Sequence, residues 1–479
     1  MLCEFIPRIR RKEFPSAPDS GINGGLRTNM NRRTAQVRPR IREERASAWR
    51  GQRSLRSQSA IQFEEIRSEV EISMQNPSLA NQSGGRVASI DIVRGLAMVV
   101  MALDHTRDFI CNIPFEPEEI NHTWGFYFLI RWVTHFCAPA FFLLAGVGAY
   151  LYGRKHSRGE LQKFLVVRGV WLVVLEFTVI GFAWTFHPGW GMFGVICCLG
   201  LSMILLAVFV RLPRSIVMAV ALIVIAIHDV FDGLKPADFA ANRWLLFVLH
   251  RTGGAHIGGF AMFVLFPLIP WCAVTLLGYS IGGLFQSNSA SNLRALVWAG
   301  AGSLLLFAVL RATNVYGNPG AAIAHSTPGD WHVMPTLSKS VILFFDVEKY
   351  PPSLEYLLMT LGGIFILLAV AGARAGTRSW GWMGRVLETY GRVPLFFYIL
   401  HLYVIHLAAG LLGFATHQPV RWLFHGGFFL NYPPDGQPYG HGLAVVCAMW
   451  IGLVVLLYFP CAWFARVKRN HPDSLLRFL

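Results

Sequence analysis

One apolar stretch of the sequence, residues 88–108, contains side chains that can hold charge and move protons. Asp91 and Arg94 stand near its start, and Asp104 and His105 stand near its end. On a helix with 100° per residue, Arg94 and His105 return to within about 20° of each other, and Asp91 falls on the same stripe. This spacing predicts an ion pair at one end of a helix and a titratable imidazole about 16 Å away at the other.

Charge inside a bilayer is costly and usually marks a functional site. Histidine changes charge near neutral pH, so His105 suits general base chemistry, and Asp104 could orient its ring and stabilise the charged form. The alternative is that His105 is a helix-end residue that faces the lipid headgroups.

The composition predicts that membrane-spanning helices position these residues. Of 479 residues, 54% are hydrophobic and 14% are charged, which excludes an ordinary soluble globule. The apolar residues come in blocks of about 20, the length that crosses a bilayer, so we expect an all-α polytopic membrane protein with a bundle of about ten transmembrane helices. The predicted spans are 88–108, 126–152, 164–185, 193–211, 214–231, 257–285, 294–313, 353–373, 391–413 and 441–463.

The distribution of Lys and Arg predicts the orientation. Basic residues gather in the short loops 153–163, 211–214 and 374–390 and after the last span. All of these segments fall on one side if both termini are cytoplasmic, as the positive-inside rule requires.

Three regions are expected along the chain. Residues 1–87 hold 16 basic and 9 acidic residues with few aromatics, which predicts a disordered, basic cytoplasmic tail, unless translation starts at Met74. Interleaved charges of both signs argue against nucleic-acid binding. A membrane domain over 88–465 and a short basic cytoplasmic tail over 466–479 follow.

The histidines are unevenly placed. Of 16, only His156 and His471 fall on the predicted cytoplasmic side, so any proton transfer is expected on the outer side. His122 lies in the first outer loop, and most such histidines are merely interfacial. His401 is near the middle of a span, where a polar group needs a partner.

Two further patterns bear on the site. Arg131 and His135 are four positions apart, hence on one helix face. The eight cysteines are scattered without a CxxC pair, and no His/Cys cluster has zinc spacing, so we expect no metal.

Several stretches together are similar to a known family. Ser89–Ala97 followed by Asp104-His105 resembles the opening of the transmembrane acyltransferases, in particular the bacterial branch related to the lysosomal heparan-alpha-glucosaminide N-acetyltransferase. Other stretches that fit this branch are Arg131–Pro139 with Leu144–Gly146, Tyr316–Pro319, Lys349–Leu354 with Leu357–Gly362, and Gly391–Phe396 with His401.

The resemblance implies transfer of an acetyl or related acyl group from cytoplasmic acetyl-CoA or another acyl-CoA to an extracytoplasmic acceptor. In the lysosomal relative this acceptor is a terminal glucosamine amine. The family's catalytic histidine lies in the first outer loop, which by position points to His122. In the broader superfamily a histidine at the place of His105 is itself catalytic, so the resemblance leaves both residues as candidates for the base.

The remaining candidates follow from the same chemistry. The coenzyme is anionic, so Arg94 and Arg392 at the cytoplasmic face are expected to hold its phosphates, although Arg94 could instead be neutralised by Asp91. Arg131, His135, His401 and Lys349 are expected to bind substrate or to be structural polar residues. The expected partners are the lipid bilayer, acyl-CoA and an outer sugar or envelope glycan in the cytoplasmic (inner) membrane of a bacterium, and a homo-oligomer is compatible with the sequence.

Two other functions fit the same residues. A proton-coupled small-molecule transporter could use the intramembrane Asp91, Arg94 and His105 as a path. A non-catalytic membrane receptor or scaffold would use none of the histidines, so changing His105 or His122 to alanine would leave its phenotype unchanged.

Overall fold

The computed structural model describes residues 87–471 apart from 188–190, 236, 238, 240–241, 258–259, 319–329, 375–379 and 425–437. Contacts within the chain set off Val87–Leu479 as one unit. Residues 1–86 of the predicted N-terminal tail, including Met74, lie outside the described residues. Residues 472–479 of the predicted C-terminal tail also lie outside them.

The unit is built almost entirely of helices. In chain order its elements are α2 (Ala88–Ile110), α3 (Gly125–Thr134), α4 (Cys137–Gly153), α5 (Arg158–Leu175), η2 (Glu176–Ile180), α6 (Gly181–Thr185), β1 (Gly191–Phe193), α7 (Val195–Phe209), α8 (Arg214–Ile227), η3 (His228–Gly233), α9 (Arg243–Leu249), β2 (Gly253–Ile257), β3 (Phe260–Val264), α10 (Leu268–Ile281), η5 (Gly282–Phe285), α11 (Ala290–Thr313), α12 (Leu337–Phe345), α13 (Leu354–Ala373), α14 (Gly381–Arg392), α15 (Pro394–Ala415), η7 (Arg421–Phe424) and α16 (Leu443–Asn470).

Ten helical segments correspond to the ten predicted spans. Eight in the described chain are long and apolar enough to cross a membrane: Gly125–Gly153, Arg158–Thr185, Arg214–Gly233, Leu268–Phe285, Ala290–Thr313, Leu354–Ala373, Pro394–Ala415 and Leu443–Asn470. The other two are α7, which is apolar but short, and α2, which is long but carries five charged residues. The predicted polytopic helical bundle is confirmed, and the protein is a multi-pass membrane protein.

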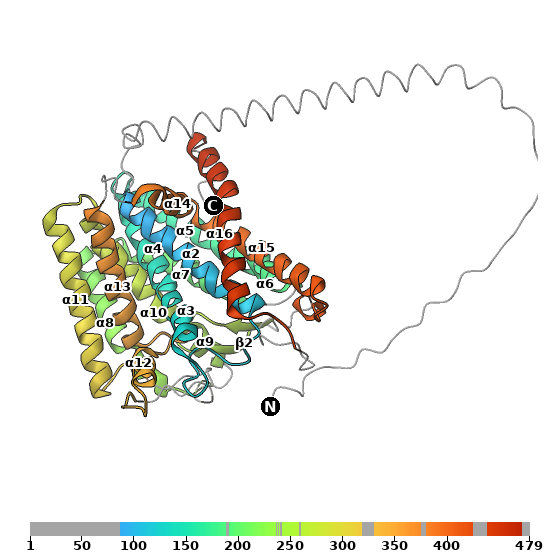
Figure 1. Cartoon of the computed structure of the whole chain (residues 1–479). Coiled ribbons are helices and arrows are strands. Elements are labelled where there is room, and N and C mark those ends of the chain that lie inside the picture. Colours follow the sequence, from blue (N-terminus) through green and yellow to red (C-terminus); the bar gives the residue numbers. More distant parts are fainter. Residues whose placement is uncertain are drawn as a thin grey trace, which may run out of the picture. The chain divides into compact units, whose positions relative to one another are not determined.

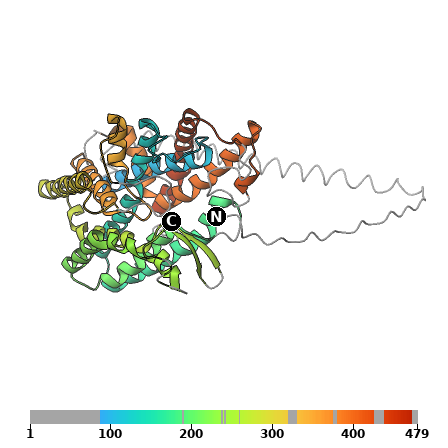
Figure 2. The ribbon, with the colours of Figure 1, turned by 90° about the horizontal axis from the view of Figure 1, so that it is seen from below.

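Helix α2 runs through the middle of the bundle (Figures 1 and 2). It packs against α3, α4, α13, α14, α15 and α16. By contrast, α11 and α16 bury only 17% of their most apolar windows and expose residues such as Trp298 and Phe459, as expected of helices that face lipid. The charged helix is therefore inside, and apolar helices surround it.

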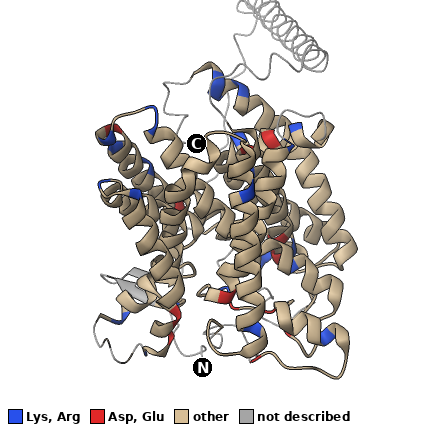
Figure 3. Cartoon of the chain, turned by 90° about the vertical axis from the view of Figure 1, so that its left-hand side faces the viewer, with Lys and Arg blue, Asp and Glu red and all other residues tan. Residues whose placement is uncertain are grey.

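Basic side chains gather toward one end of the bundle. Figure 3 shows many of the Lys and Arg residues toward the upper end of the bundle, and Figure 1 shows that α2 begins and α16 ends at this upper end. The loops predicted to be cytoplasmic, 153–163 and 211–214, connect helices at this same end. We refer below to the opposite end, where α2 finishes, as the predicted outer side.

A small sheet was not predicted. Strand β1 pairs in parallel with β3, and β3 pairs antiparallel with β2. The first part of the predicted span 257–285 is therefore wrong: its helix begins only after Pro267, and Phe260–Val264 is a strand. A short apolar run fits a buried strand as well as a buried helix, and the preceding Gly253-Gly254 pair favours the strand.

A buried carboxylate organises the segment beside this sheet. The regular helix α5 passes into the π-helix η2, which starts at Glu176. The Glu176 carboxylate accepts a hydrogen bond of 2.8 Å from the Cys197 N–H in the first turn of α7, where the helix dipole favours a negative charge. A Cβ at Gly194 would come within 2.7 Å of this carboxylate, so only glycine leaves it room.

The loop predicted over 374–390 contains the amphipathic helix α14, which lies against the start of α2. Its Gly384, Leu387 and Gly391 are buried, whereas Trp382 and Arg385 are exposed. The prediction of a loop was wrong here because a short helix that lies along the face of a bundle does not produce a membrane-length apolar block.

Two glycines allow α2 and α14 to approach closely. A Cβ at Gly391 would stand 1.8 Å from the Asp91 carbonyl oxygen, and one at Gly95 would stand 1.8 Å from the Leu387 carbonyl oxygen. Both obstacles are backbone atoms, which cannot rotate away. The contact between these helices therefore depends on the absence of a side chain at both positions.

We predict that Gly391→Ala destabilises the protein by about 1–3 kcal/mol, because the added methyl group overpacks a backbone contact. Gly148→Ala in α4 is the matched control, since a Cβ at Gly148 meets nothing within 4 Å. Thermal unfolding of both variants in the same detergent measures the difference. Equal melting temperatures would contradict the close approach.

Candidate active site

Two histidines from distant parts of the chain meet inside the bundle. His105 Nδ1 of α2 lies 2.7 Å from His401 Nε2 of α15, and the rings stack with centroids 5.0 Å apart. His401 is fully buried, and its Nδ1 lies 3.1 Å from the Phe397 carbonyl oxygen. The sequence indicated that His401 needs a partner, and the structure identifies that partner as His105.

The hydrogen bonds of this pair determine where its protons sit. A carbonyl oxygen only accepts, so His401 Nδ1 carries a proton, and when both rings are neutral His401 Nε2 must be an acceptor. His105 Nδ1 is then the donor between the rings. The lone pair of His105 is left on Nε2, which makes no hydrogen bond within the described chain.

Aromatic rings surround this pair. Trp184 of α6 meets His105 edge-on with centroids 4.9 Å apart, and Tyr398 of α15 does so at 6.2 Å. Phe397 stacks on His401 with centroids 5.4 Å apart. These contacts restrict both imidazoles to one orientation, although His105 itself keeps some exposed surface.

Asp104 contacts arginines rather than the histidine pair. Its carboxylate accepts from Arg131 at 2.7 Å and lies 3.3 Å from Arg107. Consecutive residues point about 100° apart around a helix, so Asp104 and His105 face different neighbours. The contact predicted to orient His105 is made by His401, and Asp104 instead joins α2 to α3.

A second carboxylate extends this network. Glu118, in the loop after α2, accepts from Arg131 Nε at 2.6 Å and lies 3.3 Å from His135 Nε2. Arg131 and His135 therefore share one helix face, as their spacing predicted. Burial raises the pKa of Glu118, but the charge of Arg131 and the hydrogen bond with His135 outweigh it and hold that pKa well below its usual range.

Lys349 brings another positive charge to the cluster from the segment 346–353. It is only 8% exposed and interacts electrostatically with both Asp104 and His105. Its ammonium lies 5.0 Å from the ring centroid of Tyr350, and the Arg131 guanidinium lies 5.9 Å from the same centroid. Its side chain forms no hydrogen bond or ion pair within the described chain.

Residues of η3 and α11 hold the segment that carries Lys349. His228 Nε2 lies 2.7 Å from the Pro352 carbonyl oxygen, and Asp229 accepts from the Leu354 N–H at 2.9 Å. Arg311 donates to the Asp346 carbonyl oxygen at 2.9 Å. The position of Lys349 thus depends on η3 and α11, which lie far from it in sequence.

The predicted ion pair is present at the other end of α2. Arg94 lies 3.3 Å from Asp91 and also donates to the Gly391 carbonyl oxygen at 3.2 Å. Arg392 pairs with Glu388 on α14. Both arginines keep part of their side chains exposed, 19% for Arg94 and 33% for Arg392, so either could contact a ligand at this end.

His122 lies apart from the buried cluster. Its side chain is 59% exposed, contacts Glu119 at 2.9 Å and packs against the Phe115 ring. No hydrogen bond or ring contact joins it to His105, His401 or Arg131 within the part of the chain that the structure describes. Of the two histidines that the resemblance offers as the base, His105 is the one with a buried histidine as its partner, His401.

One serine stands in a GxSxG pattern, which is typical of nucleophiles, but its place in the fold does not suit that role. Residues 278–282 match this pattern. Ser280, however, lies inside α10 and donates to the Leu276 carbonyl oxygen. This arrangement differs from the strand-to-helix turn that such a nucleophile requires. The described residues contain no group of three His, Cys, Asp or Glu side chains that could hold a metal ion.

Residues 86–316 match the family model described as heparan-alpha-glucosaminide N-acetyltransferase, catalytic. The chain is related to this acetyltransferase family. No curated protein sequence matches the chain significantly. The resemblance seen in the residues is confirmed, and it indicates a membrane acetyltransferase.

The family match covers only part of the cluster. His105, Arg131 and His135 lie within the matched residues, whereas Lys349 and His401 lie beyond them. Two residues of the cluster had no signal of their own in the sequence. Glu118 is one of several acids in an outer loop, and Tyr350 stands out only as part of the motif Lys349–Leu354.

We predict that Glu348, next to Lys349, makes stability depend on pH. Burial raises the pKa of Glu348 to about 7 from 4.5, against the hydrogen bond from the Tyr350 N–H, which lowers it. Between these values the folded protein keeps a proton that the unfolded chain has lost, so stability falls as pH rises through this window. Between pH 5 and pH 8, the melting temperature should therefore fall by more in the wild type than in Glu348→Gln.

Glu119→Gln, at a half-buried carboxylate that contacts His122, serves as the control for the loss of a carboxylate and should keep the wild-type pH dependence. Identical pH profiles for the wild type and Glu348→Gln would show that Glu348 does not titrate in this range.

Proposed function

We propose that the protein transfers an acetyl or related acyl group from acyl-CoA, taken from the cytoplasm, to an amine or hydroxyl acceptor on the outer side, with His105 as general base. The hydrogen bond between His105 Nδ1 and His401 Nε2 carries this proposal. It leaves His105 Nε2 as an oriented nitrogen with a free lone pair inside a membrane protein related to acetyltransferases.

The chemistry needs one proton acceptor. The acceptor nitrogen or oxygen attacks the thioester carbonyl carbon, and His105 Nε2 takes the proton that this atom loses. The new C–N or C–O bond forms as the carbonyl becomes a tetrahedral oxyanion. When the C–S bond breaks, the proton passes from His105 to the leaving thiolate, so coenzyme A departs as the thiol and the histidine is restored.

The neighbouring charges fit this sequence of steps. Lys349 and Arg131 bring positive charge near His105, where an oxyanion develops. Fixed positive groups in a site that excludes water stabilise such charge strongly. Arg131 is already committed to Asp104 and Glu118, whereas Lys349 has no such partner, so Lys349 is the better group to stabilise the oxyanion.

His401 acts through His105 and is a positioning residue. It accepts a hydrogen bond from the His105 Nδ1–H and so keeps His105 Nε2 free for the substrate, as the third member of a catalytic triad does for its histidine. Its burial prevents the ring from rotating, and its hydrogen bond to the Phe397 carbonyl keeps the proton on Nδ1.

The opposite end of α2 suits the anionic donor. Arg94 and Arg392, both partly exposed, could receive the phosphates of the coenzyme beside α14. The acceptor we favour is an amino sugar or envelope glycan, and the membrane is the cytoplasmic membrane of a bacterium with both termini on the cytoplasmic side.

We predict that His105→Ala lowers turnover of labelled acetyl-CoA by about 10²–10⁴-fold, because it removes the base. His122→Ala, the matched control, should keep near wild-type turnover. The assay uses the purified full chain with a panel of amino sugars and follows both transfer and hydrolysis. A large loss in His122→Ala with normal turnover in His105→Ala would overturn this assignment.

His401 should show the signature of positioning. His401→Leu removes the acceptor for His105 Nδ1 and should lower kcat and alter the pH profile of kcat/KM, whereas His401→Gln offers an amide oxygen and should restore part of both. A purely structural role would leave the pH profile unchanged. Proton-coupled uptake into vesicles that is lost with Asp91→Asn, without acetyl transfer, would favour the transporter instead.

A further inference from the structure

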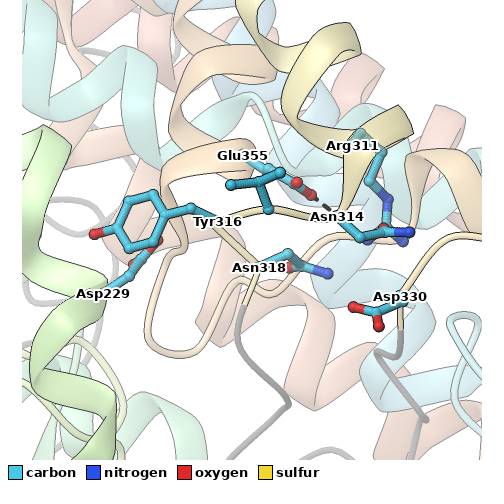
Figure 4. A pocket seen from close by; sticks show the side chains of 9 residues that line it. Asp229, Arg311, Asn314, Tyr316, Asn318, Asp330 and Glu355 are labelled. Carbon is cyan, nitrogen blue, oxygen red and sulfur yellow. Dashed lines mark hydrogen bonds and ion pairs between the residues drawn. The ribbon is translucent and has the colours of Figure 1, made fainter.

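A polar cavity of about 210 Å³ lies at the predicted outer side, between η3, the end of α11 and the start of α13 (Figure 4). It is separate from the residues assigned to acyl transfer. At roughly 30 Å³ per water molecule, it has room for about seven waters, or for an organic molecule of similar heavy-atom count. Its polar lining consists of Asp229, Arg311, Asn314, Tyr316, Asn318, Asp330 and Glu355.

The positive charge of this cavity is already committed. Arg311 is 1% exposed and donates to three backbone carbonyl oxygens, those of Leu343, Phe344 and Asp346. Asn314 is also satisfied, because both ends of its amide bond to the backbone of Trp331. Neither side chain is available to a ligand without breaking these contacts.

Other lining groups lack adequate partners. Glu355 is also 1% exposed, and its ion pair with Arg311 spans 3.5 Å, longer than an ordinary charged hydrogen bond. The buried Asn318 Nδ2 has no hydrogen-bond partner within the described chain, although its Oδ1 accepts from the Glu348 N–H. Asp330 is exposed, and its carboxylate makes no hydrogen bond to the described residues.

These groups determine which kind of molecule the cavity can bind. Of the three carboxylates that line the cavity, Asp229 already accepts from the Leu354 N–H and lies 3.0 Å from His228 Nε2. The other two, Glu355 and Asp330, outnumber the single arginine, so the cavity carries excess negative charge.

The available acceptors of the cavity are the carboxylate oxygens of Glu355 and Asp330. Its available donors are the Asn318 amide N–H and the buried Tyr316 hydroxyl, which has no hydrogen-bond partner within the described chain. We propose that the cavity binds a small protonated amine that also carries a hydroxyl or carbonyl oxygen, with the ammonium at Glu355 and Asp330 and the oxygen at Asn318.

Two residues that line the cavity also contact the segment that carries Lys349. Asn318 Oδ1 accepts from the Glu348 N–H at 2.9 Å and lies 3.4 Å from the Ser353 hydroxyl. Arg311 pairs with Glu355 and also holds the Asp346 carbonyl. A ligand that engages Asn318 and Glu355 therefore stabilises both ends of segment 346–353. This binding does not require that His105 be a catalytic base.

The test measures binding directly, with ethanolamine as the probe and no acyl-CoA present. The full chain is placed in phosphatidylglycerol nanodiscs, which contain no amine headgroup, and studied by calorimetry and thermal unfolding. We expect saturable binding of ethanolamine but not of ethylene glycol, which lacks the charge, or of N-acetylethanolamine, which is neutral. Equal responses to all three, or to none, would overturn the proposal.

Two variants locate the site. Glu355→Gln should weaken ethanolamine binding by at least about tenfold, because it removes a buried charged acceptor. Asp330→Asn, an exposed change that should not disturb folding, should weaken it by about threefold to fivefold. Glu119→Gln, which removes a carboxylate elsewhere on the same side, should bind as the wild type does. Unchanged binding in Asp330→Asn and in folded Glu355→Gln would place the amine elsewhere.

The protonated amine that we propose for the cavity could come from a free amine or from a lipid headgroup. Phosphatidylethanolamine nanodiscs distinguish them: if the headgroup occupies the cavity, the wild type melts higher there than Asp330→Asn, and free ethanolamine adds no further shift. Repeating the titration in His105→Ala separates this site from the proposed transferase, since binding should persist there even if transfer is never detected.

Discussion

A charged group inside a membrane protein has to find its partner within the protein, because lipid offers none. Helix α2 carries five charged side chains and a histidine, and its neighbours are arranged to meet them. Asp91 and Arg94 pair with each other and reach α14, Asp104 meets Arg131 of α3, and His105 meets His401 of α15. The central place of α2 is a consequence of this requirement.

Close packing at the glycines supports the same arrangement. Arg94 can reach the Gly391 carbonyl only because α2 and α14 approach without side chains at Gly95 and Gly391. In a bundle without a hydrophobic driving force between helices, small residues that allow backbones to approach are a main source of helix association. Here they also bring two partly exposed arginines to one end of α2.

The long spans could be predicted from the sequence because a block of about 20 apolar residues has few alternatives in a protein. The small sheet could not, since Phe260–Val264 is apolar in either conformation and the pairing partner Gly191–Phe193 lies about 70 residues earlier. Asp91 and Arg94 were predictable as a local pair three residues apart. The contact of His105 with His401 was not, because 296 residues separate them and each has several conceivable partners.

The contrast between His105 and His122 shows what a motif leaves undetermined. By loop position His122 matches the place of the family's catalytic histidine, yet its ring is mostly exposed and paired only with Glu119. A general base needs a fixed tautomer and a site from which water can be excluded, and both follow from partners that the loop does not supply. His105 has these features: one nitrogen held by a buried histidine, aromatic rings on its edges, and nearby a lysine whose side chain forms no ion pair within the described chain. These features are what supports the proposal that the base lies at the end of the first span, one loop before the position that the family resemblance indicates.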